Sequence, residues 1–140
     1  MANVVTNIAS ALLKYTFTDE DGMIVAHFNM NPADVKLYDR LNNIDAKIEE
    51  LQKRFQGKDN DSAFAIEFNN AVEDLFCYVI GYDVKTCLFG FISATSIMED
   101  GTSFYEKVLE VMQNAVGKEV EKRAKKMQKN IEKYTGKYAQ

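Results

Sequence analysis

The sequence has few of the residues that interrupt helices or that most often bind metals and take part in catalysis. Its 140 residues include one proline, one histidine, two cysteines and no tryptophan. A single proline leaves room for long helices. The lone histidine, His27, has no second His or Cys at ligand spacing, which argues against a zinc site and against a Ser-His-Asp triad. Cys77 and Cys87 sit among Phe, Leu and Tyr, so we expect two reduced thiols that pack as small apolar side chains.

Long apolar runs and ligand-binding loops are also missing. No segment reaches the roughly 18 to 20 apolar residues that span a bilayer. The N-terminal VVTNIASALL segment has no basic leader before it, so we expect a cytoplasmic protein with no membrane partner. No glycine-rich phosphate loop is present, and Asp59-Asn60-Asp61 fails as a calcium loop because Phe64 and Asn70 stand where Gly and Glu are required. We therefore expect no enzyme activity, no cofactor, no metal site and no small-molecule substrate.

Apolar residues, by contrast, are abundant. They make up 46% of the chain, with 11% aromatic, which is enough for one folded domain with a substantial core. The net charge of -4 is unevenly placed, because residues 118–137 carry eight Lys or Arg and three Glu. The acidic balance of the whole chain argues against nucleic acid as its partner.

The stretch from Phe64 to Phe91 organises the predicted fold. Its first half has apolar residues at helical spacing in a stripe wide enough to be covered on both sides, which predicts a core helix. Gly81 is expected to end this helix, and Asp83 to cap a short turn after it. The segment Ile92 to Met98 is predicted to be irregular or a brief helical turn.

Alternating apolar residues before the helices predict a β-hairpin. Leu13, Tyr15 and Phe17 alternate with polar residues, and the alternation resumes from Ile24 to Met30, with Gly22 in the left-handed position of the loop. A two-stranded hairpin alone is only marginally stable in water, so this hairpin must pack on the helices or pair with a strand of a neighbouring chain. Residues 3–13 are predicted to form a short amphipathic helix ahead of it.

The first long helix is predicted from Asn31 to about Phe55. Asn31 would be its N-cap and Pro32 its first residue. Its apolar residues follow steps of four and three and form what we call the first seam, comprising Leu37, Leu41, Ile44 and Ile48. A polar loop then returns the chain antiparallel to the core helix.

The last helix is predicted to open at Ser103 with a capping box closed by Glu106, and to have two halves. The half before Gly117 has a broad apolar stripe suited to the core. Beyond it, a thin apolar line in steps of four and three runs among basic residues and consists of Val120, Ala124, Met127, Ile131 and Tyr134. Its larger side chains form what we call the C-terminal seam, comprising Val120, Met127, Ile131 and Tyr134. Three interpretations stay open here: a solvated helix end, docking of a partner helix, and contact with nucleic acid or a membrane surface.

These elements predict a mainly α fold. It is a small helical domain with three main helices, short turns and an N-terminal hairpin at about residues 13–31. Residues 1–117 form the predicted domain, and residues 118–140 form an extended basic helix. The apolar seams exceed what one compact domain of this size can bury, so we expect a homo-oligomer or another protein partner.

One order of elements resembles a known family. The apolar helix, Gly81-Tyr-Asp83, the Leu88-Phe89-Gly90 turn, Asp100-Gly101 and the helix opening Phe104-Tyr-Glu-Lys-Val-Leu109 are similar to the small tail assembly chaperones of siphophages, myophages and related prophages. The similarity covers about residues 14–116. It implies a non-enzymatic morphogenesis factor that binds and solubilises the tape measure protein in the host cytoplasm. On that view either the first seam or the C-terminal seam carries the contact.

A second class of function remains beside the chaperone. The chain could be a structural helical subunit of a phage particle, of connector or baseplate type, or another homo-oligomeric helical interaction protein. Mass spectrometry of purified particles separates the two, because an assembly factor is absent from the finished particle and a structural subunit is present.

Overall fold

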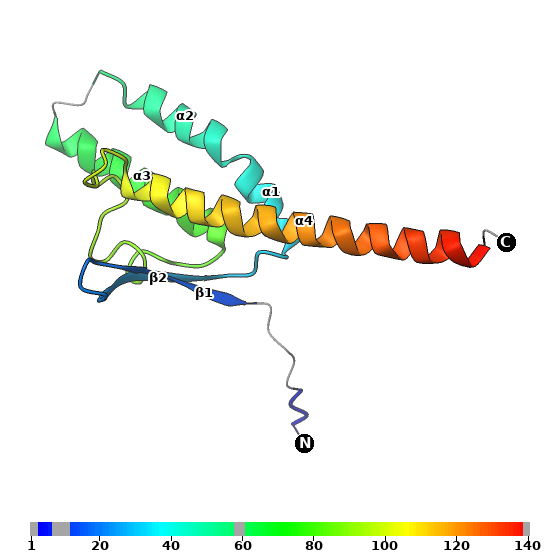
Figure 1. Cartoon of the computed structure of the whole chain (residues 1–140). Helices are drawn as coiled ribbons and strands as arrows, with labels where there is room; N and C mark the ends of the chain where they lie inside the picture. Colours follow the sequence, from blue (N-terminus) through cyan, green and yellow to red (C-terminus); the bar gives the residue numbers. More distant parts are fainter. Residues whose placement is uncertain (1–2, 7–11, 58–60, 139–140) are drawn as a thin grey trace.

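Two strands and four helices form the regular structure of residues 3–6, 12–57 and 61–138, which this computed structural model describes, with side chains described up to residue 133. Residues 3–6 lie outside any helix, and the rest of the predicted N-terminal helix falls largely outside the described residues. The elements follow the order shown in Figure 1, namely β1 (Leu13–Thr18), β2 (Ile24–Met30), α1 (Val35–Asn42), α2 (Ile44–Arg54), α3 (Ser62–Ile80) and α4 (Phe104–Tyr138).

The predicted hairpin is confirmed. β1 and β2 pair antiparallel from Leu13 opposite Met30 to Thr18 opposite Ile24, with an irregularity after Phe17. Gly22 has a φ of 82°, the left-handed conformation expected of it. The inner face of the hairpin lies on the helices, because the Phe17 ring meets the Phe104 ring of α4 edge-on at 5.4 Å.

The first predicted helix starts three residues late. Asn31 is not its N-cap, because the Asn31 Oδ1 accepts a hydrogen bond from the Ala33 N–H at 2.9 Å and closes a turn ahead of the helix. Asp34 takes the N-cap position instead, in extended conformation, and its Oδ1 accepts from the Lys36 N–H at 3.0 Å. Asn and Asp both cap helices well. In this chain Asn31 stabilises the turn and Asp34 caps the helix.

The same helix is also divided. α1 ends at Asn42 and α2 begins at Ile44, with Asn43 between them at φ -97° and ψ 0°. The Asn43 Nδ2 donates to the Asp39 carbonyl at 3.0 Å, so its side chain competes with the helical main chain. The chain bends at this point (Figure 1), which lets both helices pack against α3.

The core helix α3 is confirmed, with Asp61 as N-cap and Gly81 ending it at a φ of 103°. Val72, Phe76 and Val79 are fully buried. The Phe76 ring lies 6.0 Å from the ring of Phe89 and 6.3 Å from that of Tyr105, so α3 packs against both the following linker and α4.

The linker between α3 and α4 is irregular, as predicted, and is tied to β2. The Asn29 N–H donates to the Tyr82 hydroxyl at 2.7 Å, and the His27 N–H donates to the Cys87 carbonyl at 3.0 Å. Burial raises the pKa of Tyr82. Asp83 caps the short turn as expected, accepting from the Lys85 N–H at 3.0 Å. These contacts cover one edge of the hairpin.

A buried carboxylate holds the far end of the linker. Glu73 of α3 is 8% exposed, and its Oε2 accepts from the Ala94 N–H at 3.2 Å and from the Asn69 Nδ2 at 2.8 Å. The Asn69 Oδ1 in turn accepts from the Thr95 N–H at 3.0 Å. A buried polar group needs such partners, and here they fix the linker on α3.

The start of α4 differs in detail from the predicted capping box. Among the described residues no side-chain hydrogen bond joins Ser103 and Glu106, and the Ser103 carbonyl instead accepts from the Glu106 N–H at 3.1 Å. Ser103 is occupied in a main-chain bridge with Ile97. Lys107 pairs with Asp100 and holds the pKa of that carboxyl well below its usual range.

Candidate partner-binding surface

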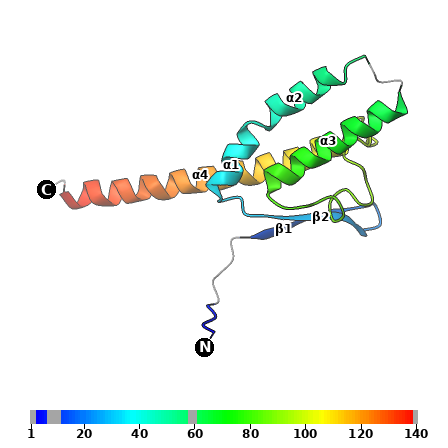
Figure 2. The same cartoon turned by 180° about the vertical axis from the view of Figure 1, so that it is seen from behind.

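The long helix α4 has one half in the core and one half outside it. Phe104, Val108, Met112 and Val116 are buried, whereas no described side chain after Gly117 is buried. The predicted boundary at residue 117 therefore falls inside one continuous helix. Figures 1 and 2 both show the C-terminal half extending beyond all other elements. At about 1.5 Å per residue, the part after Gly117 is roughly 30 Å long.

The C-terminal seam lies on this projecting half. Val120 is 45% exposed, Met127 64% and Ile131 56%. Tyr134 belongs to the same helix, and its side chain lies outside the described residues. An exposed apolar line on a helix whose other half already completes a core is available to a second protein.

The first seam has a different position. Leu37, Leu41, Ile44 and Ile48 are each less than 10% exposed and belong to the same core as α3. A partner could reach these side chains only if the fold opened. The hypothesis that the first seam carries a partner contact is therefore not retained, and its residues are assigned to intramolecular packing.

Sequence reasoning missed a groove at the base of the projection. Here the segment entering α1 faces α4, and Val35 and Tyr38 are 70% and 46% exposed. The groove has a volume of about 330 Å³, and we call it the basal groove, lined by Pro32, Ala33, Asp34, Val35, Tyr38, Val120, Arg123, Ala124 and Met127. It continues the C-terminal seam onto the body. The spacing of Val35 and Tyr38, three apart, was the available signal.

Arg123 joins the two sides of the basal groove. Its guanidinium donates to the Ala33 carbonyl of the segment before α1. The same side chain lies 3.9 Å from the Glu119 carboxylate one turn earlier on α4. This arrangement holds the start of the projection against the body, so the seam starts from a fixed position.

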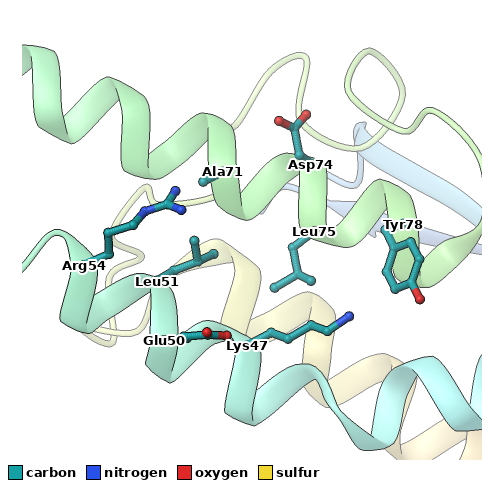
Figure 3. A pocket seen from close by; sticks show the side chains of 8 residues that line it. All are labelled: Lys47, Glu50, Leu51, Arg54, Ala71, Asp74, Leu75 and Tyr78. Carbon is teal, nitrogen blue, oxygen red and sulfur yellow. The ribbon is translucent and has the colours of Figure 1, made fainter.

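A second cleft lies between α2 and α3 (Figure 3). It has a volume of about 530 Å³, an apolar floor and a charged rim, and is lined by Lys47, Glu50, Leu51, Arg54, Ala71, Asp74, Leu75 and Tyr78. The Lys47 ammonium lies 4.4 Å from the Tyr78 ring centroid. Asp74 points away from the cleft and pairs with Lys85 at 2.5 Å. The charged side chains that remain on the rim, Lys47, Glu50 and Arg54, are of both signs.

Elsewhere in the described part of the chain, side chains that could bind a metal or act in catalysis do not cluster. No cluster of three or more His, Cys, Asp or Glu able to hold a metal occurs among those residues. His27 and the acidic turn near Gly22 lie on the hairpin, away from the C-terminal seam. Cys77 and Cys87 are free, half-buried thiols. Within the same residues, no helix has both the length and the apolar character to cross a membrane.

Comparison of the chain with protein-family models, with curated proteins and with solved structures finds no match. The candidate binding surface is therefore identified from the exposed apolar residues of this chain alone. It consists of the C-terminal seam and the basal groove.

Proposed function

We propose that the protein is a non-enzymatic phage tail assembly chaperone that binds and solubilises the tape measure protein in the host cytoplasm. The observation that supports this most is the exposed C-terminal seam on a helix whose first half completes a closed core. The resemblance in the order of elements from Leu75 to Leu109 supplies the family. No cofactor, metal, nucleic acid or membrane has a part in the proposed function.

The chemistry of the seam suits a helical partner. Apolar side chains at steps of four and three pack against the same pattern on another helix, as in helix-in-groove recognition. A tape measure protein, as a long helix with exposed apolar positions, presents that pattern repeatedly. The Lys and Arg residues that surround the seam keep the free protein soluble and would pair with acidic residues beside the partner's apolar stripe.

The expected affinity per contact is modest. Complete burial of an aliphatic side chain contributes about 1.5 to 3 kcal/mol, and the seam residues are about half exposed, so each gains about 1 kcal/mol when covered. A partner covering the seam and the basal groove would then gain only a few kcal/mol per copy after ordering costs. Weak, repeated contacts are what a chaperone needs, because it must give way when tail tube subunits polymerise.

Co-expression with a tape measure fragment tests the proposal. We expect the fragment to move from the insoluble to the soluble fraction when this protein is present, and to be recovered with it in a pull-down. The matched control is co-expression with an unrelated helical protein of similar charge. A fragment that stays insoluble and is not recovered would contradict the chaperone function. Detection of this protein in purified particles would favour the structural subunit instead.

A further inference from the structure

The two edges of the hairpin differ in the hydrogen bonding of their outward main-chain groups. In an antiparallel pair, directly opposite residues either exchange both of their main-chain hydrogen bonds or exchange none. The N–H groups of His27 and Asn29 point away from β1, since they donate to Cys87 and to Tyr82. This edge, formed by β2, is covered by the linker.

The same geometry leaves the β1 edge open. Thr16 is opposite His27 and Lys14 is opposite Asn29, so the main-chain groups of Thr16 and Lys14 point away from β2. Among the described residues no hydrogen bond to these outward groups is present, and both residues are exposed. In Figures 1 and 2 no helix lies along the outer side of β1. A two-stranded sheet with one open edge is a template for a third strand.

We propose that the open edge of β1 pairs with β1 of a second copy of this chain. The strands would run antiparallel with Thr16 opposite Thr16 of the second copy, forming a continuous four-stranded sheet. The inference concerns self-association and does not depend on the tape measure protein.

Charge complementarity favours a second copy of this chain as the partner of β1, and it favours the register in which the two Thr16 residues are opposite each other. With the two Thr16 residues opposite each other, Lys14 faces Thr18 of the second copy, and the exposed Glu20 of that copy lies in the turn that follows its Thr18. The acidic turn formed by Asp19, Glu20 and Asp21 in each copy then flanks the Lys14 of the other. A register with Lys14 opposite Lys14 would place like charges together and is disfavoured.

The inner face of the sheet also fits this register. Tyr15 and Phe17 point toward the core side and are only half-buried in the single chain. In the proposed pair, Tyr15 of each copy is opposite Phe17 of the other, and aromatic cross-strand pairs of this kind stabilise sheets. The remaining exposed surface of both rings would be covered by the second copy.

Sedimentation velocity over a range of concentrations tests the pairing with Thr16→Pro. Proline removes the outward N–H of residue 16 and leaves the β1–β2 hydrogen bonds intact, because that N–H does not point to β2. We expect the wild-type chain to form a dimer and the variant to raise the dimer dissociation constant at least tenfold, with an unchanged circular dichroism spectrum. A wild-type chain that stays monomeric at every concentration, or a Thr16→Pro variant that dimerises normally, would overturn the proposal.

Swapping two charges tests whether the strand that pairs with β1 belongs to a second copy of this chain. Lys14→Glu should raise the dissociation constant about tenfold, and the double variant Lys14→Glu with Glu20→Lys should restore it. Within one chain these residues are about 15 to 20 Å apart along the strand, so rescue can only arise between copies. Failure of the double variant to restore dimerisation would refute the register. Dimerisation lost on Met127→Asp and retained on Lys14→Glu would place the interface on α4 and also refute it.

Discussion

Replacing Phe76 with alanine is expected to lower the free energy of unfolding by about 3 to 5 kcal/mol. Phe76 is fully buried in the C-terminal half of α3, and its ring lies beside Phe89 of the linker and Tyr105 of α4. Its removal therefore leaves a cavity where three elements meet. Because a domain of this size is stable by only about 5 to 15 kcal/mol, the variant should be close to unfolding at physiological temperature.

Urea denaturation followed by circular dichroism measures this loss. Ile66→Ala is the matched control, because Ile66 lies on the same helix and is 61% exposed. We expect the control to change stability by less than about 0.5 kcal/mol. Equal losses for the two variants would mean that the face of α3 assigned to the core is wrong.

The double variant Met127→Asp with Ile131→Asp is expected to abolish capture of a tape measure fragment while the domain stays folded. Both side chains are more than half exposed, so no core packing is lost with them. A carboxylate at each position would have to be buried against the apolar stripe of the partner, which is costly without a partner charge. We expect the affinity to fall by at least about a hundredfold and the Tm to change by less than about 3 °C.

A pull-down combined with a thermal melt measures both effects. Lys125→Ala with Lys129→Ala is the matched control, since it changes the net charge by the same amount on the opposite face of the helix. The control should retain most of the capture, with a weaker dependence on salt. A large drop in Tm for the aspartate variant would show that the C-terminal seam is part of the core.

The hairpin and the core helix could be predicted because local pattern decides them. The alternation in β1 places Tyr15 and Phe17 on the face that packs against the core, and Gly81 ends α3 in a conformation that other residues avoid. The break at Asn43 could not be predicted in the same way. The apolar pattern continues from Leu41 to Ile44 without interruption. The bend is favoured by the Asn43 side chain, which donates to the Asp39 carbonyl, together with the packing of both helices on α3.

The candidate surface was predicted in part. The sequence shows two thin apolar seams of equal quality, and periodicity cannot say which one α3 will cover. The structure buries Leu37 and Ile44 because α3 packs onto α1 and α2, and it leaves Met127 exposed because the half of α4 after Gly117 extends beyond the other elements (Figure 1). For the basal groove, the spacing of Val35 and Tyr38 indicates one apolar side, but the meeting of the two sides could not be foreseen, since it depends on Arg123 contacting the Ala33 carbonyl, 90 residues apart in sequence.

Hydrogen exchange of the wild-type chain, with and without a tape measure fragment, tests most directly whether the projecting half of α4 is the binding surface. We expect the fragment to slow exchange of the main-chain amides from Gly117 to Ile131 and around Val35, and to leave those of α3 unchanged. Slowed exchange confined to α2 and α3, or no change anywhere in the chain, would contradict the account.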